Sequence, residues 1–224
     1  MRQARNIFDG KSTRVIRCLL VNFGKEWVIR SIAEETQVAL GYTHAVVATL
    51  IKLGYVARNE NNKLVVTNPT RLLKRWAAYH QYDVMNRFLD YYTFERDLQK
   101  QLDQLRKIRK PDYSLTSLVG AWLKKPYVRP TDIHLYVKSE TDAKKMAEAL
   151  GLNPTPEAGN VKMVIPYDEG AFYGSQEIDG VKVVSNVQLY VDLYNYPARG
   201  EEAAGKIFEA ISKEWAKQET AVNV

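Results

Sequence analysis

The sequence of 224 residues contains one cysteine, three histidines and no long apolar segment. A single thiol excludes an internal disulfide and a cysteine-based zinc site, and Cys18, in the apolar stretch RVIRCLLVNF, is expected to be a buried small side chain. No apolar run approaches the roughly 20 residues that a membrane-spanning helix needs. The basic segment MRQARNIFDGK leads into no apolar signal region, so we expect a cytoplasmic protein without membrane partners.

Common catalytic motifs are also missing from the sequence. It contains no glycine-rich phosphate loop, no GxSxG and no HExxH, and the histidines His44, His80 and His134 are widely separated. We therefore expect no metal site, no cofactor and no catalytic residue, which directs the interpretation toward a binding protein.

Positive charge is unevenly distributed along the chain. Residues 1–110 contain 20 Lys and Arg against 10 Asp and Glu, whereas residues 111–224 contain 12 against 16. A basic first half suits a polyanion such as DNA, while an acidic second half would repel one. We therefore expect the two halves to have different functions.

The first half shows the order of elements that is typical of a winged helix-turn-helix. Apolar residues recur at helical spacing, a glycine follows the third helical segment, and two β-type runs flank a polar turn directly after it. The expected elements are a helix at 11–23, a strand at 27–29, a helix capped by Ser31, a helix at 42–54 and a hairpin at 55–66.

In a helix-turn-helix the second of the paired helices enters the major groove, while the preceding helix and the wing contact phosphates. Candidate DNA-binding residues are the cations and hydrogen-bonding side chains on these elements: Arg14 (with Arg17 on the same helix), Arg30, Ser31, Tyr42, Thr43, His44, Lys52, Arg58 and Lys63. Thr43 is expected to be exposed and to affect sequence preference. Lys52 and Arg58 are expected to strengthen binding to every sequence, because phosphate contacts do not read bases.

A long segment connects the two halves. Residues 69–91 are expected to form one helical stretch, and the charged helix at 95–110 stops at Pro111, which cannot continue it comfortably. The predicted domains are a winged helix-turn-helix at 1–68, a helical connector at 69–110 and a C-terminal domain at 111–224. The aromatic residues of 76–92 and the charged helix also suit a dimer or partner interface, with DNA binding incidental.

The second half mixes helical and strand patterns, which predicts an α+β fold whose mixed α/β C-terminal domain is built around a small sheet. The expected elements are helices at 114–125 (capped by Ser114) and 141–152 (capped by Thr141), two helices after residue 185, and strands at 132–137, 162–167 and 181–184.

Part of this domain has the layout of a nucleotidyltransferase site. Such enzymes carry Gly-Ser on a helix and then, on a strand, two alternating carboxylates that hold magnesium. Gly120-Ala121 stands at the first position here, and Asp132 with His134 at the second. Ala121 has no hydroxyl and His134 is a poor ligand for magnesium, so we expect a degenerate nucleotidyltransferase-like fold. The alternative function is a divergent magnesium-dependent nucleotidyltransferase tethered to nucleic acid.

The run VQLYVDLYNYPARGEEAAGKIF, residues 187–208, is dense in charged and tyrosine side chains. Ser185 is expected to cap a helix with one apolar side, which would leave Asp192 on the opposite, wetter side. Arg199 can pair with Asp192 or with a glutamate at the start of the next helix. We therefore expect a structural role for this run, with Asp192 and Arg199 as candidates for partner contact.

The sequence combines an N-terminal winged helix, a connector, and a C-terminal domain that contains SLTSLVGAWLKKPYVRPTDIHLYV and VVSNVQLYVDLYNYPARGEEAA. This combination resembles the AbiEi family of transcriptional-regulator antitoxins from type IV toxin-antitoxin systems. The resemblance implies a protein that represses its own operon by binding inverted repeats in double-stranded DNA, for which a homodimer is suited. It also implies a C-terminal domain that counters a nucleotidyltransferase-like toxin, and it supplies no catalytic residues. A regulator with no toxin partner is the other interpretation in this class.

Overall fold

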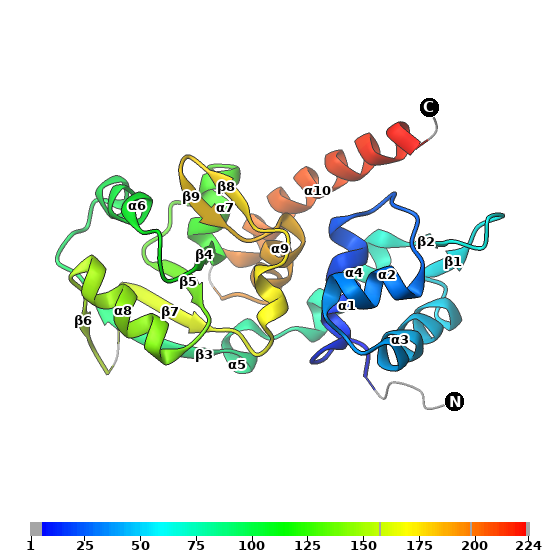
Figure 1. Ribbon diagram of the computed structural model, residues 1–224. Helices are drawn as coiled ribbons and strands as arrows, with labels where there is room; N and C mark the ends of the chain where they lie inside the picture. Colours follow the sequence, from blue (N-terminus) through cyan, green and yellow to red (C-terminus); the bar gives the residue numbers. More distant parts are fainter. Residues whose placement is uncertain (1–5, 157, 198, 223–224) are drawn as a thin grey trace.

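The computed structural model describes residues 6–156, 158–197 and 199–222 (Figure 1). It mixes helices and strands, which confirms the α+β class. Within these ranges no helix is long and apolar enough to cross a membrane. The elements are α1 (Ser12–Val21), α2 (Ile29–Thr36), α3 (Leu40–Lys52), β1 (Val56–Arg58), β2 (Leu64–Val66), α4 (Pro69–Tyr79), α5 (Tyr82–Met85), β3 (Arg87–Tyr92), α6 (Leu98–Lys107), β4 (Tyr113–Thr116), α7 (Ser117–Lys124), β5 (Ile133–Val137), α8 (Glu140–Leu150), β6 (Asn153–Pro154), β7 (Val161–Ile165), the 3₁₀ helix η1 (Glu169–Phe172), β8 (Gln176–Ile178), β9 (Val181–Val183), α9 (Asn186–Tyr194) and α10 (Gly200–Val222).

Residues 12–66, from α1 to β2, form three helices and a hairpin that we call the helical unit (Figure 1, right). Leu19, Ile32 and Leu50, one from each helix, lie in a shared core and are almost fully buried. The antiparallel hairpin pairs β1 with β2, and Trp27 adds a single bridge to Leu64. The order of elements predicted from the sequence is therefore present, and apolar periodicity accounts for it.

Two local predictions in the helical unit need correction. The strand expected at 27–29 is reduced to the Trp27 bridge, and α2 already begins at Ile29. Ser31 therefore lies inside α2 and does not cap it. By contrast, Gly54 follows α3 with a φ of +73°, a left-handed conformation that glycine adopts without steric cost.

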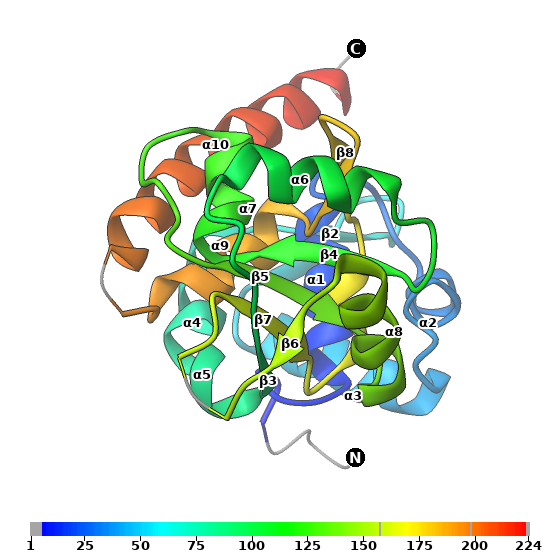
Figure 2. The same cartoon turned by 90° about the vertical axis from the view of Figure 1, so that its left-hand side faces the viewer.

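The second half is built on a seven-stranded sheet with the order β6-β3-β7-β5-β4-β9-β8. Pairs β5–β7 and β4–β9 are parallel, and the other neighbours are antiparallel. We call residues 87–194 the sheet unit. Side chains alternate along β5, so Leu135 packs toward α6 and α8, while Tyr136 packs toward α7 and α9. Figure 2 shows α6 and α8 over the face nearest the viewer.

The long helical stretch expected at 69–91 is wrong in its second half. α4 ends at Tyr79, a short α5 follows, and residues 87–92 form β3. Phe88 and Tyr91 therefore belong to a strand, although their spacing also fits a helix. β3 pairs with β7 over five positions, from Arg87↔Ile165 to Tyr91↔Val161, and this pairing with a distant segment decides the structure.

Two capping predictions in the sheet unit also differ from the structure. Residues 113–116 form β4 and not the start of a helix, so Ser114 lies in a strand, where its Oγ bonds the Oγ of Ser175. The helix begins at Ser117 instead. α8 is capped by the Ser139 side chain and not by Thr141, and it ends at Gly151 as predicted.

Three helices join the two units. α4 packs through Trp76 and Leu72 into the core that also contains α1 and α9. α10 crosses from the sheet unit toward the helical unit (Figure 1), where the Trp215 indole Nε1 donates to the Leu20 carbonyl at 3.0 Å. α9 lies between these helices, with residues 186–193 all buried. The core is therefore continuous from α1 to the sheet.

Candidate functional site

The turn between α2 and α3 is closed by backbone and side-chain hydrogen bonds. Gln37 adopts a left-handed φ of 53° and its N–H donates to the carbonyls of Ala33 and Glu34. Thr43, expected to be exposed, is fully buried, and its hydroxyl donates to the Val38 and Ala39 carbonyls at 3.3 and 3.2 Å. The expectation of exposure was wrong because Thr43 faces back into this turn, where its hydroxyl links the start of α3 to the preceding residues.

Replacement of Thr43 by valine is therefore expected to lower the free energy of unfolding by about 1 kcal/mol, the usual net value of one buried hydrogen bond. Sequence preference should stay unchanged, because the side chain cannot reach a base. The control is Thr49→Val, which removes a bond to the Ala45 carbonyl within the same helix. Denaturant titration gives the stability, and a selection from randomised duplexes gives the preference; a changed preference for Thr43→Val alone would contradict the prediction.

The outward side of α3 carries side chains suited to contact with a polyanion. Tyr42 is 41% exposed, although its hydroxyl bonds the Ser12 Oγ at 2.8 Å and so ties α3 to α1. His44 and Lys52 are exposed on the same helix. These three side chains are exposed on α3, as the sequence predicted.

Further cations lie on the neighbouring elements. Arg30 is exposed near the start of α2, and Arg58 and Lys63 flank the hairpin tip. The Arg58 Nη1 donates to the Asn62 carbonyl at 2.8 Å, across the turn in which Asn62 has a φ of 57°. Among the described side chains, Arg30, Lys52, Arg58 and Lys63 form no ion pair, so their charges are available to a ligand.

The cations of α1 differ from these because they point into the protein. Arg14 is 20% exposed and pairs with Asp168 at 2.8 Å, and Arg17 is fully buried. Burial lowers the pKa of Arg17, with Tyr167, Asp168 and Asp192 opposing that shift. The expectation that the α1 cations face the duplex is therefore wrong for Arg17, and Arg14 is already neutralised by a carboxylate.

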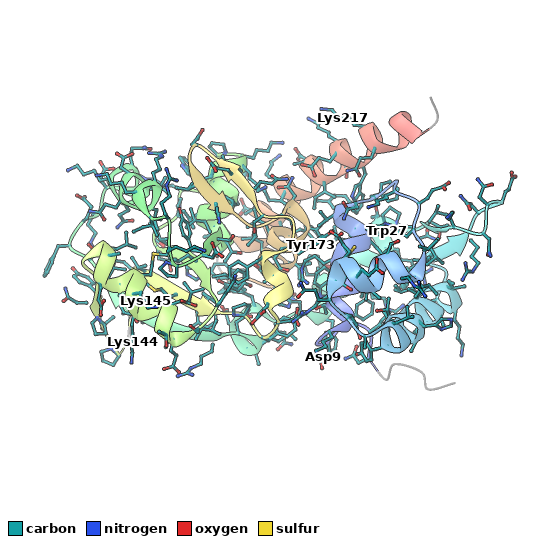
Figure 3. The ribbon with its side chains drawn as sticks, in the orientation of Figure 1. Asp9, Trp27, Lys144, Lys145, Tyr173 and Lys217 are labelled. Atoms are coloured by element: carbon teal, nitrogen blue, oxygen red, sulfur yellow. The ribbon has the colours of Figure 1, made fainter. Side chains whose placement is uncertain are left out.

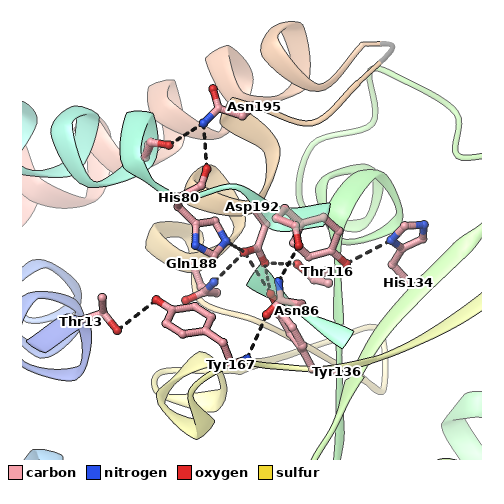
Figure 4. Close-up of polar contacts among 12 residues, drawn as sticks. Thr13, His80, Asn86, Thr116, His134, Tyr136, Tyr167, Gln188, Asp192 and Asn195 are labelled. Carbon is pink, nitrogen blue, oxygen red and sulfur yellow. Dashed lines mark hydrogen bonds and ion pairs between the residues drawn. The ribbon is translucent and has the colours of Figure 1, made fainter. Parts of the chain in front are cut away.

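A cluster of buried polar side chains surrounds Asp192 (Figure 4). The carboxylate, expected on an exposed side, is fully buried and accepts hydrogen bonds from four side chains. The distances are 2.6 Å from Thr116 Oγ1, 2.7 Å from Gln188 Nε2, and 3.1 Å from both Tyr136 OH and His80 Nε2. Asp192 is therefore corrected from a partner contact to a structural acceptor that joins α9 to β4, to β5 and to His80, the residue after α4.

Sequence reasoning missed this cluster because its members come from β4, β5, α9 and the residue that follows α4. One signal was present: Gln188 and Asp192 are four residues apart on one helix, a spacing that allows their side chains to interact. Burial of the Tyr136 hydroxyl in this cluster raises its pKa strongly, with the nearby Asp192 charge acting in the same direction. Tyr136 therefore stays protonated and serves as a donor.

Arg199 lies on the surface, as predicted. Its Nη2 pairs with Glu202 at 2.7 Å, three residues ahead, and its guanidinium lies 5.4 Å from the centre of the Tyr127 ring. Lys206 approaches the same ring at 5.5 Å, and Tyr127 is 48% exposed. Tyrosine and arginine are enriched among the residues that contribute most to binding at protein interfaces.

The residues in the nucleotidyltransferase-like layout serve packing and internal hydrogen bonding. A Cβ at Gly120 would come within 3.0 Å of Leu189, so a small residue is needed where α7 meets α9. His134 is 2% exposed, and its two ring nitrogens contact Tyr82 OH at 3.1 Å and Asp132 at 3.0 Å. Over the described ranges no group of three His, Cys, Asp or Glu side chains is placed to hold a metal ion.

A family model described as transcriptional regulator, AbiEi antitoxin, type IV TA system matches residues 63–212. The match covers the sheet unit, α4 and most of α10, and it begins inside the hairpin, so α1, α2 and α3 lie outside it. Neither the curated proteins nor the solved structures gave a match to the chain.

Proposed function

The chain belongs to the AbiEi family of transcriptional regulators and antitoxins of type IV toxin-antitoxin systems, and from this premise we propose that it is a DNA-binding repressor of its own operon. The helical unit is a winged helix-turn-helix in this proposal. α3 reads the major groove, and the β1–β2 hairpin is the wing that contacts the phosphate backbone. DNA binding rests on the helical unit itself, since the family match does not include its helices.

The observation that carries the proposal is a group of cations on α2, α3 and the hairpin that have no ion-pair partner among the described side chains. Several cations elsewhere are neutralised: Lys138 and Lys182 pair with Asp112, Lys162 with Asp90, and Arg199, just before α10, with Glu202. Arg30, Lys52 and Arg58, which are exposed, and Lys63, which is half-buried, have no such partners among the described side chains. Because unpaired cations release counterions from phosphates when they bind, they supply affinity for a nucleic acid.

The sheet unit carries the antitoxin function in this proposal and counters a nucleotidyltransferase-like toxin in the cytoplasm. The proposed partner contacts are the exposed Tyr127 of this unit and the nearby Arg199 and Lys206, which is half-buried, supported by the contacts of both cations with the Tyr127 ring. Two copies bound to an inverted repeat would match the two-fold symmetry expected of such operators. Growth of cells that express the toxin should recover with the wild-type chain and recover less with Tyr127→Ala.

DNA binding is tested with the full chain and two fluorescent duplexes, one from the region upstream of its own coding sequence and one scrambled duplex of equal composition. We expect affinity for the upstream duplex to exceed that for the scrambled one by about a thousandfold or more, as for other specific regulators. With about six phosphate contacts, log K should fall against log salt with a slope of about −5. Equal affinity for both duplexes and a slope near zero would reject the proposal.

A further inference from the structure

α1 is held by the sheet unit through hydrogen bonds along its length. The Tyr167 hydroxyl donates to Thr13 Oγ1 at 3.2 Å near the start of α1. Just beyond its end, the Asn22 amide donates to the Tyr173 hydroxyl at 2.8 Å, and Figure 3 shows Tyr173 at the boundary of the two units. Tyr173 also donates to Glu35 of α2 at 2.8 Å. The helical unit is therefore attached to the sheet unit by side chains as well as by the chain itself.

The central contact of α1 is a buried chain of three side chains. Arg17 Nε donates to Gln188 Oε1 at 2.8 Å, and Gln188 Nε2 donates to Asp192 Oδ1 at 2.7 Å. Arg17 and Asp192 are fully buried, and Gln188 is 1% exposed. The Gln188 amide thus orients toward a cation on one side and an anion on the other, which strengthens both hydrogen bonds in this water-free setting.

α1 is also the support on which the DNA-reading helices rest. Ile16 and Leu19 of α1 lie in the same core as Ile32 of α2 and Val46 of α3. The Ser12–Tyr42 hydrogen bond adds a polar tie between α1 and the start of α3. A displacement of α1 would therefore be transmitted to α3, because tightly packed helices move together.

We propose that Arg17, Gln188 and Asp192 are positioning residues for DNA binding, a relay through which α9 of the sheet unit holds α1 and so preorganises α2 and α3. The inference rests on the proposed DNA-binding function. Being buried, none of the three touches DNA, and the relay acts by keeping the reading helices ordered before binding, which removes an ordering cost at the moment of association. Coupling of this kind is reciprocal, so DNA binding would also stabilise α9.

The test compares two full-length variants that each break buried hydrogen bonds. Gln188→Met keeps the side-chain length and breaks the relay. Tyr113→Phe removes the hydroxyl that donates to the Leu105 carbonyl at 3.0 Å, on the opposite face of the sheet. If denaturation shows that Gln188→Met is poorly folded, Arg17→Lys, which removes the Nε donor to Gln188 and keeps a positive charge, takes its place.

Amide hydrogen exchange followed by mass spectrometry is the first readout, and it does not need DNA. Gln188→Met should speed exchange in residues 29–52 beyond any global destabilisation, whereas Tyr113→Phe should affect only β4 and α6. Unchanged exchange in residues 29–52 of Gln188→Met would overturn the relay. This result stands whether or not the wild-type chain proves to bind its upstream duplex.

DNA affinity is the second readout. Gln188→Met should bind the upstream duplex about tenfold more weakly, within the range typical of coupled sites, with the wild-type salt slope. Tyr113→Phe should change affinity less than about twofold, as expected of a site without coupling to DNA. Wild-type affinity in Gln188→Met would reject the inference, and so would a salt slope reduced by about one unit, because that reduction would mean a lost phosphate contact. A wild-type chain that does not distinguish the two duplexes would reject the proposed function instead.

Discussion

Replacement of Asp192 by alanine is expected to lower the free energy of unfolding by about 3–5 kcal/mol, the range for removal of one partner from a buried charged network. The carboxylate is fully buried and accepts from four donors at 2.6–3.1 Å. Without it, Thr116, Gln188, Tyr136 and His80 would each lose an acceptor in a region closed to water. Since whole domains are stable by only about 5–15 kcal/mol, the variant should be close to unfolding.

Two further variants make this expectation testable by denaturant titration of the full chain. Asp192→Asn keeps the shape but has one acceptor oxygen in place of two, so it should fall between wild type and Asp192→Ala. Glu202→Ala removes an exposed acid whose ion pair with Arg199 leaves both side chains 51% exposed, and it should change stability by less than about 0.5 kcal/mol. Similar losses of stability in Asp192→Asn and Glu202→Ala would show that the buried carboxylate is not important for the stability of the fold.

The Asp192 expectation also separates two explanations of a loss of antitoxin activity. If Asp192 contacted a partner, its replacement would abolish the activity of a chain that remains folded. Because the structure buries it, we expect activity and stability to fall together, whereas Arg199 variants should affect activity with little change in stability. Measuring both quantities for each variant distinguishes a structural acceptor from a partner contact.

Local chemistry accounts for the elements that were predicted correctly. Gly54 after α3, the polar turn between β1 and β2, and the Ser185 side chain that accepts from the Gln188 N–H are all signals within a few residues of the structure they determine. The exposed positions of Tyr42, His44 and Lys52 follow from the same local periodicity. Such signals identify helices, turns and caps without knowledge of the rest of the chain.

The failures depend on distant segments. Residues 87–92 are a strand because β7, some seventy residues later, pairs with them. Asp192 looks exposed on a helical wheel, since a polar side usually faces water. α9, however, is surrounded by α1, α4, α7 and α10, so its polar side meets other polar side chains. A sequence pattern shows that a helix has a polar side but does not show what covers it.

Replacement of Lys52 and Arg58 together by glutamine is expected to weaken binding to every duplex. Two lost phosphate contacts should reduce the salt slope by about 1.8, which corresponds to a loss on the order of 50-fold at 0.1 M salt. The two side chains are exposed on α3 and at the end of β1, and neither has an ion-pair partner among the described residues. The ratio between the upstream and scrambled duplexes should stay near the wild-type value, because phosphate contacts do not read bases.

The matched control is Lys144→Gln with Lys145→Gln, which changes the net charge equally. Both lysines are exposed on α8, at the opposite end of the molecule from the hairpin (Figure 3). At 0.1 M salt the Debye length is about 10 Å, so these distant charges should contribute little to DNA affinity. Equal losses in the two double variants would mean that overall charge, and not the surface of α3 and the hairpin, attracts DNA. A loss confined to Lys52 and Arg58 would place the phosphate backbone against the helical unit.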